Sequence, residues 1–399
     1  MFVYLLPLLA FTSAQSTVDP SVLIDVFGPP PTQPTVTTSP QFEDITVKPT
    51  DKNEFTDKNG QSCKCVPYYL CSAELVGVDA NNSTVTGWGE LDIRFGEDEC
   101  QESVERCCTT PKDPTDVDIH KPDPTRLRGC GYRNPKGVDF TIKGGTGTEA
   151  EFGEFPWVAA LLDNRNQSYV GVGVIVHPQV VMTAAHIAYK FPEPTTLTAR
   201  AGEWDTQTEK ERLPFQQRVV QEIYIHKDFH PRNLRNDVAL LRLAQPLELA
   251  QHINVVCLPR QDESFDSSRG CVANGWGKDK FGLRGRYAVI LKKLELGVVR
   301  RARCLELLRR TRLGSAFRLH DSFLCAGGDE GRDTCQGDGG APLACPIGDD
   351  RYKLTGLVSW GIGCGGKDVP AVYANVAGFR QWVDDKMAEW GYDTSGYNV

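Results

Sequence analysis

Near the end of the 399-residue chain stands Asp333-Thr334-Cys335-Gln336-Gly337-Asp338-Gly339-Gly340-Ala341-Pro342-Leu343, whose glycines predict a tight turn. Two earlier segments belong with it: Thr183-Ala184-Ala185-His186 follows an apolar run, and Asn236-Asp237-Val238 opens another. Acyl transfer needs a nucleophile, a base that takes its proton, and a carboxylate that fixes the tautomer of the base. A lone histidine or aspartate is more often structural. Here, however, the order of a histidine, an aspartate and a Gly-rich turn matches one known arrangement of these groups.

Further segments match the same arrangement, each weak alone but specific in this order: Gly153-Glu154-Phe155-Pro156-Trp157, Asn274-Gly275-Trp276-Gly277, Ser359-Trp360-Gly361 and Val372-Tyr373-Ala374-Asn375-Val376. With them, residues 130 to 390 resemble the chymotrypsin-like serine protease family. Short apolar runs between Gly- and Pro-bearing turns independently predict an all-β barrel or sandwich. The resemblance implies a double β-barrel. Helical spacing in the tail, from Val376 to Trp390, predicts a C-terminal helix.

The residue expected to be the nucleophile is a glycine. By the resemblance, His186 would be the base and Asp237 its orienting carboxylate, with the nucleophile between Asp338 and Gly340. Gly339 stands there, and it has no oxygen with which to attack a carbonyl. In subtilisin, deleting the nucleophile costs about 2 × 10⁶ in turnover. The sequence therefore predicts a serine protease homologue with no catalytic residue, not an enzyme.

The specificity pocket and one disulfide of the family are also altered. Asp333 matches the acid at the floor of a trypsin-like pocket, which Gly361 would help to line. Ala371 replaces a wall glycine, and its methyl should narrow the pocket, so Asp333 is interpreted as a remnant and not an anchor for arginine or lysine. Ile187 replaces a family cysteine, whose partner is missing from Val170 to Val176.

Zymogen activation by the family's route is not expected. Family members are cut after arginine or lysine to free an Ile-Val-Gly-Gly terminus, whose ammonium pairs with the aspartate before the nucleophile. Here the segment reads Thr141-Ile142-Lys143-Gly144-Gly145. A cut after Lys143 would free Gly144, which cannot fill an isoleucine pocket. Asp338 is therefore expected to lack this partner.

Fourteen cysteines argue for seven disulfides in an oxidising compartment. Zinc is the alternative, but Cys63-Lys64-Cys65 is too tight for zinc-finger spacing and no paired histidines accompany it. The segment from Cys63 to Cys108 resembles the clip domain of arthropod proteases, some other six-cysteine module being the alternative. The two resemblances imply the pairs Cys63–Cys107, Cys65–Cys100, Cys71–Cys108, Cys130–Cys257, Cys271–Cys345, Cys304–Cys325 and Cys335–Cys364.

Composition divides the chain. Its segments are a signal peptide over 1–14, a flexible Pro/Thr-rich arm over 15–60, the clip domain over 61–109, a linker over 110–129 and the protease-like domain over 130–399. The first apolar run is too short for a membrane anchor, so we predict secretion. A net charge of −8 and no long basic stretch argue against nucleic acid as a partner. Sequons place candidate glycosylation sites at Asn81, Asn82 and Asn166.

The stretch Arg200-Ala201-Gly202-Glu203-Trp204-Asp205-Thr206-Gln207-Thr208 resembles non-catalytic clip-domain homologues, and among them insect prophenoloxidase-activating cofactors. This resemblance implies a secreted hemolymph protein of innate immunity, cleaved by an upstream clip-domain serine protease. It would self-assemble and help to activate prophenoloxidase in melanisation. A pattern-recognition or adhesive protein that binds microbial surfaces is the alternative. Calcium at Glu203 and Asp205 is implied; a solvated acidic turn is equally compatible, because Thr206 to Phe215 does not clearly supply later ligands.

Cleavage is predicted at Arg94. Arg94 and Arg106 are the only basic residues between Cys71 and Cys107. Arg106 abuts Cys107, where the disulfides should keep a protease out. Arg94 lies between stapled cysteines in the kind of exposed loop that proteases prefer. A cut there would leave the fragments tied and free a binding face around Tyr68 and Tyr69; an ordinary surface arginine is the alternative.

Overall fold

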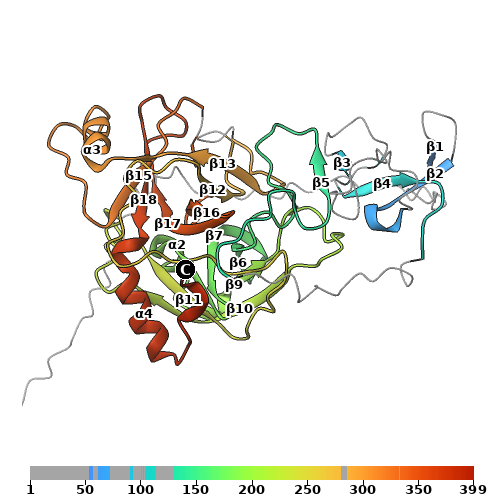
Figure 1. The fold of residues 1–399 in the computed structure, drawn as a ribbon, viewed down its shortest axis with the longest axis horizontal. Coiled ribbons are helices and arrows are strands. Elements are labelled where there is room, and N and C mark those ends of the chain that lie inside the picture. The colour runs from blue at the N-terminus through green and yellow to red at the C-terminus, as the bar shows by residue number, and fades with distance from the viewer. Residues whose placement is uncertain are drawn as a thin grey trace, which may run out of the picture. The chain divides into compact units, whose positions relative to one another are not determined.

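The computed structural model describes residues 54–56, 62–71, 90–92, 100, 102, 104–113, 129–279, 285–331 and 333–399 (Figure 1). The predicted signal peptide, the linker from 114 to 128, Arg94, Asn81 and Asn82 lie outside the described residues, as does the predicted arm apart from residues 54–56. No helix among the described residues is both long and apolar enough to cross a membrane.

The first half of the protease-like domain closes into an antiparallel barrel with the strand order β10-β11-β8-β7-β6-β9. Its strands are β6 (Val158–Asp163), β7 (Ser168–His177), β8 (Val180–Thr183), β9 (Leu197–Ala201), β10 (Gln216–Ile225) and β11 (Ala239–Leu243). All six residues of β6 are buried. Such a run is buried on both faces because the barrel interior lies on one side and further structure covers the other. Leu161, Ile175 and Leu241 pack into one of the two core clusters.

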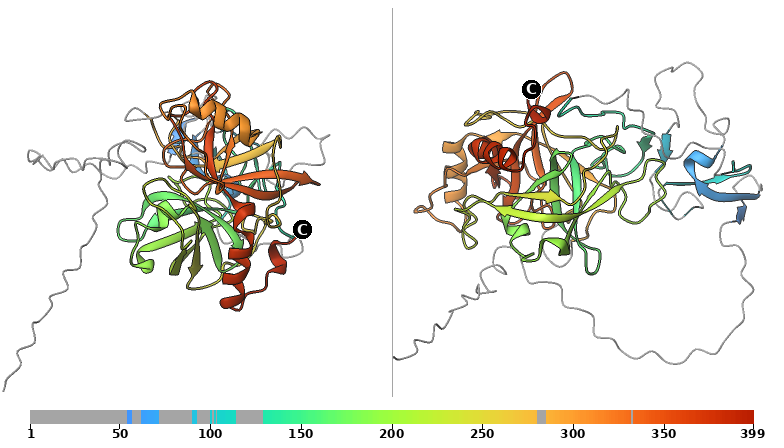
Figure 2. Two further views of the ribbon diagram at one scale, coloured as in Figure 1. Left: turned by 90° about the vertical axis from the view of Figure 1, so that its left-hand side faces the viewer. Right: turned by 90° about the horizontal axis from the view of Figure 1, so that it is seen from below.

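The second half forms a seven-stranded antiparallel sheet in the order β13-β12-β16-β17-β18-β15-β14. Its strands are β12 (Cys271–Gly275), β13 (Lys292–Leu296), β14 (Val298–Val299), β15 (Phe323–Ala326), β16 (Pro342–Gly348), β17 (Arg351–Trp360) and β18 (Ala371–Asn375). Figure 2 shows the green barrel strands and the orange-red strands of this sheet as two layers. Two barrel-like sheets and few helices confirm the predicted chymotrypsin-like fold.

The helices are short: α2 (Ala185–Ala188), α3 (Arg301–Arg309) and α4 (Arg380–Glu389), with 3-10 turns η5 (Pro194–Thr196), η6 (Val376–Phe379) and η7 (Ser395–Tyr397). Helix α4 is the predicted C-terminal helix. It buries Val383 and Met387, and Trp382 stacks on Tyr224 of strand β10 with ring centroids 5.2 Å apart. The apolar stripe in the tail is therefore core packing against the barrel.

The small N-terminal domain contains the sheet β1-β2-β4, with β1 (Glu54–Thr56), β2 (Ser62–Pro67) and β4 (Glu105–Cys108), and the turn η1 (Tyr68–Leu70). Strand β3 (Glu90–Asp92) pairs in parallel with β5 (Thr141–Lys143). Three disulfides hold this domain, Cys63–Cys107, Cys65–Cys100 and Cys71–Cys108. The other four are Cys130–Cys257, Cys271–Cys345, Cys304–Cys325 and Cys335–Cys364, so the structure joins all seven pairs that the resemblances imply.

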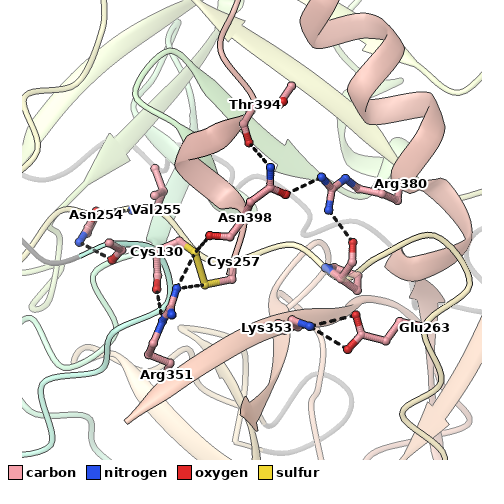
Figure 3. Close-up of a disulfide and its surroundings, with 12 residues drawn as sticks. Cys130, Asn254, Val255, Cys257, Glu263, Arg351, Lys353, Arg380, Thr394 and Asn398 are labelled. Atoms are coloured by element: carbon pink, nitrogen blue, oxygen red, sulfur yellow. Dashed lines mark hydrogen bonds and ion pairs between the residues drawn. A yellow bond between two sulfur atoms is a disulfide. The ribbon is translucent and has the colours of Figure 1, made fainter. Parts of the chain in front are cut away.

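The Cys130–Cys257 disulfide lies beside the end of the chain (Figure 3). Arg351 donates from Nε to the Cys130 carbonyl oxygen at 3.2 Å, and its Nη2 lies 3.3 Å from the Cys130 sulfur. The Asn398 carbonyl oxygen lies 3.3 Å from the same sulfur. Arg380 holds Asn398 in place by donating to its side-chain oxygen at 2.6 Å. The start and the end of the protease-like domain therefore meet at one point.

The clip domain contacts the protease-like domain through a buried polar cluster; all described residues belong to one unit, Pro40–Val399. The Tyr68 hydroxyl donates to Asp139, which is 2% exposed, and Arg212 donates to Asp139 Oδ1 at 2.8 Å. The Tyr68 ring also packs edge-on against Phe140 with centroids 4.8 Å apart. Burial, and then the Asp139 charge, raises the pKa of Tyr68 well above its ordinary value, so the hydroxyl remains a donor.

A second contact is ionic and lies near the surface, where the side chain of Lys210 is 42% exposed and that of Glu105 is 11% exposed. Lys210 Nζ lies 2.9 Å from Glu102 and 2.8 Å from Glu105 of the clip domain, and Thr208 donates to Glu102 at 2.9 Å. Exposed ion pairs contribute little stability each. Apolar burial therefore contributes most of the docking energy, because Tyr68, Tyr69 and Phe140 belong to one core cluster.

Candidate functional site

The histidine and the aspartate of the predicted site meet because β8 and β11 are neighbouring strands, with Thr183 paired to Ala239. His186 follows β8, and Asp237 precedes β11. Asp237 is completely buried. Its two carboxylate oxygens lie 2.8 Å from His186 Nδ1 and 2.8 Å from the His186 backbone nitrogen, and Ser359 Oγ donates to it at 2.5 Å. Three contacts to the carboxylate fix the orientation of the imidazole.

Gly339 faces the other side of the same imidazole. A Cβ atom built on Gly339 would lie 2.8 Å from His186 Nε2 and 3.1 Å from the Ile187 side chain. The first of these distances is shorter than a carbon–nitrogen contact allows without movement. The imidazole and Ile187 therefore crowd the space that a side chain at position 339 would need.

The turn before Gly339 has its own hydrogen bonds. Asp338 is buried and accepts from the backbone nitrogens of Gly277 at 2.8 Å and Cys335 at 2.9 Å. Burial raises the pKa of the Asp338 carboxyl, and the nearby Lys292 charge opposes this shift. The Tyr169 hydroxyl donates to the Gly337 carbonyl at 2.8 Å. The turn is thus held by backbone and tyrosine donors.

The segment from Thr141 to Gly145, where the family's activation cut would lie, has hydrogen-bond partners other than Asp338. Ile142 lies in β5, and its backbone nitrogen donates to Glu151 Oε2 at 2.7 Å. This hydrogen bond and the pairing of β5 with β3 hold the backbone of the segment in place. In the uncut chain, Asp338 and Ile142 therefore have separate partners.

Asp333, the acid at the floor of the predicted pocket, is bound by the backbone near Gly365. Its Oδ2 accepts from the Gly365 nitrogen at 3.1 Å, while its Oδ1 is buried and has no hydrogen-bond partner among the described residues. Burial raises the pKa of Asp333 to about 7, so a fraction of the carboxyl is neutral at physiological pH. Ala371 is buried at the start of β18, and a Cβ on Gly361 would meet only Gly363 within 4 Å, at 3.5 Å.

At the position of the family disulfide that this chain lacks, Ile187 packs against the backbone of a neighbouring strand. Ile187 lies against Gly171 of β7, where a Cβ would be 3.2 Å from the Ile187 Cδ1 atom and 2.9 Å from the Gly339 carbonyl oxygen. Gly171 is within the run Val170 to Val176 that lacks the expected cysteine. An aliphatic side chain therefore fills the gap beside the altered site.

The acidic loop contains a third carboxylate that sequence reasoning missed. Glu203 accepts from Arg200 Nη1 at 2.9 Å, and Asp205 Oδ1 accepts from the Gln207 nitrogen at 2.9 Å. Glu211 accepts from the Asp205 nitrogen at 3.4 Å. Burial, and less strongly the charges of Glu203 and Asp205, raises the pKa of Glu211 to about 8. The sequence spacing did not reveal Glu211, because the loop must fold back before this side chain lies beside Asp205.

These carboxylates do not form a tight ligand cluster as they stand. Among the described residues, the one group of potential ligand atoms gathered within 4.8 Å consists of Cys65, Cys100 and Cys107, which are all in disulfides. A cation at the acidic loop would therefore need small movements of the side chains. Asn166, the one described glycosylation candidate, is exposed in the turn between β6 and β7.

Comparison with known proteins gives two family matches. The trypsin profile matches residues 145–383, and the profile described as "Serine protease Clip domain PPAF-2" matches residues 52–109. Phenoloxidase-activating factor 2 of Galleria mellonella is 51% identical over 303 residues, which cover 72% of this chain and 98% of that protein. Inactive CLIP domain-containing serine protease A8 of Anopheles gambiae is 39% identical over 329 residues, 80% of this chain and 87% of that protein.

Proposed function

Because this chain belongs to the trypsin-like serine protease family and carries a clip domain, we propose that it is a secreted, non-catalytic cofactor of prophenoloxidase activation. The observation that carries the proposal is Gly339, which faces His186 where the family's nucleophile would stand. The retained His186–Asp237 pair has no oxygen nucleophile to activate at that position. The names of the relatives, a phenoloxidase-activating factor and inactive clip-domain proteases, support both parts of the proposal.

Regulation would come from cleavage at Arg94 by an upstream clip-domain protease. Strand β3 ends at Asp92, two residues before Arg94, and it is paired with β5 of the protease-like domain. A cut after Arg94 would separate Cys63, Cys65 and Cys71 from their partners along the chain, but three disulfides would keep the fragments together. The cut would allow the clip domain to rearrange, and Tyr68 and Tyr69, which are buried in the uncut chain, would become accessible to prophenoloxidase.

Reconstitution tests this role. Prophenoloxidase and its activating protease should give substantially more phenoloxidase activity with the cleaved protein than without it. N-terminal sequencing should find a new terminus at Phe95, and Arg94→Gln should abolish both the cut and the cofactor activity. Arg106→Gln, the matched control, should leave both intact. An Arg94→Gln protein that still supports full activation would contradict the regulatory proposal. Binding to microbial glycans without any effect on prophenoloxidase would favour the adhesive alternative.

We also propose that the acidic loop binds calcium through Glu203, Asp205 and Glu211, whose oxygens suit a hard cation. A cation that binds only the folded state at 100 times its dissociation constant stabilises that state by about 2.7 kcal/mol. Calcium should therefore raise the thermal midpoint at pH 7.5 by several degrees, and EDTA should reverse the shift. Asp205→Asn should abolish the shift, whereas Glu209→Gln, a change at an exposed residue of the same loop, should keep it. An equal calcium response in wild type and Asp205→Asn would exclude this site.

A further inference from the structure

One short segment is strongly basic although the chain as a whole is acidic. Residues 300 to 320 contain seven arginines, no lysine and one acid, Glu306, which gives +6. Since the net charge of the chain is −8, the remaining residues sum to −14. The sequence contains no long basic stretch, but this short segment is a local exception to its acidic balance.

Helix α3 presents the arginines outward. Its buried side consists of Cys304, Leu307 and Leu308, and the Cys304–Cys325 disulfide ties that side to strand β15. The opposite side exposes Arg303, Arg309 and Arg310. The basic side chains thus lie on a rigid element held from below, and not on a free tail.

A second loop extends the basic surface. The Asn236 backbone nitrogen donates to Ser322 Oγ at 3.1 Å, which brings the loop with Arg235 beside the segment that follows α3. Arg235 and Arg301 both lower the pKa of His320, after the larger effect of burial, so their positive charges lie near one ring. We define the arginine face as Arg235, Arg300, Arg301, Arg303, Arg309, Arg310, Arg312 and Arg318, of which all but Arg301 are exposed.

Acidic neighbours neutralise this face only in part. Among the described residues, Glu306 pairs with Arg303 at 2.9 Å and also with Arg310, and Asp321 pairs with Arg301 at 2.8 Å. Asp368 lies 3.9 Å from Arg303. Four exposed arginines of the face have no acidic partner among the described residues, namely Arg235, Arg300, Arg309 and Arg318, and their positive charge attracts a polyanion.

We propose that the arginine face binds a polysaccharide that carries sulfate or phosphate groups. A guanidinium offers a planar fork of donors that matches such oxyanions in pairs, and residues 300 to 320 contain arginine but no lysine. Helix α3 is about 13 Å long, which suits a few sugar units. A DNA duplex carries oxyanions of the same kind and is therefore the competing ligand in the test below. Seven disulfides also place the protein in an oxidising compartment, where such glycans occur.

Two ligands are used in the test. Heparin carries sulfate groups, and a teichoic acid carries phosphate groups. The full secreted chain should bind at least one of them at 0.15 M salt. The combined variant Arg303→Ser, Arg309→Ser, Arg310→Ser and Arg318→Ser should weaken that binding on the order of 10²–10³-fold. The slope of log affinity against log salt concentration should also become shallower by about 3, because fewer counterions are released.

A control variant that loses four positive charges elsewhere distinguishes an effect of the arginine face from an effect of net charge. Lys136→Ser, Arg165→Ser, Arg260→Ser and Arg286→Ser remove four exposed cations elsewhere and should change the affinity less than about threefold. Both variants should keep the wild-type circular dichroism spectrum and thermal midpoint. The proposal is overturned if neither glycan binds, if the control loses as much affinity as the arginine-face variant, or if duplex DNA binds as tightly as the glycans. None of these outcomes depends on a role in prophenoloxidase activation.

Discussion

The purified protein, intact or treated with a trypsin-like protease, should hydrolyse arginine, lysine and aromatic amide substrates no faster than buffer. The expected deficit is about 10⁶-fold relative to an active trypsin-like enzyme, since removal of the nucleophile alone has that effect in subtilisin. A chromogenic amidase assay, with an active trypsin as positive control, measures it. Turnover that titrates with protein concentration and survives repurification would falsify the central claim.

Gly339→Ser should also fail to produce a normal enzyme. Its Cβ would meet His186 Nε2 at 2.8 Å, so the imidazole or the turn would have to move before a hydroxyl could be activated. Asp338 would still have its backbone partners, and the segment at Ile142 would still lack the terminus that active relatives create. Active-site titration with a fluorophosphonate should label Gly339→Ser at least a hundredfold more slowly than trypsin. Rapid labelling would mean that the site lacks only the serine to be an active one.

Arg212→Ala should be the most destabilising single change at the clip contact. It leaves the Asp139 carboxylate, which is 2% exposed, without its cationic partner and dependent on Tyr68 alone. Breaking a buried ion pair in this way costs about 3–5 kcal/mol. For a domain of this size that corresponds to a fall of roughly 10 °C in the thermal midpoint. Hydrogen exchange should also accelerate at residues 62–71, because the unpaired Asp139 charge destabilises the contact with Tyr68.

Two controls accompany Arg212→Ala. Adding Asp139→Asn should recover much of the lost stability, because the uncompensated buried charge is then gone. Arg260→Ala removes an exposed arginine and should change the free energy of unfolding by less than about 0.5 kcal/mol. A clip domain that stays equally protected in Arg212→Ala would show that the buried cluster does not hold it.

Much of the fold could be predicted from the order of motifs. The segments around His186, Asp237 and Gly339 predict strands that must converge. The β8–β11 pairing joins the first two segments, and the turn before β16 places Gly339 beside the imidazole. The cysteine pairs also followed from the resemblances, because two scaffolds with known connectivities account for all fourteen cysteines. Helical spacing in the tail predicted α4 for the same physical reason that amphipathic helices bury one stripe.

The rest depended on side-chain placement that no spacing encodes. Glu211 joins Glu203 and Asp205 only because the loop turns back on itself. The arginines of α3 could be counted in the sequence, but their meeting with Arg235 required two loops distant in sequence to pack together. The net charge of −8 concealed them, because a sum over the chain contains no information on where the charges lie.

A mechanical pull between Cys130 and Asn398 would load two points of the protease-like domain that lie side by side. Cys130 is bridged to Cys257, and its sulfur lies 3.3 Å from the Asn398 carbonyl oxygen. A pull applied between these two points would therefore act across a few neighbouring groups and would extend neither sheet.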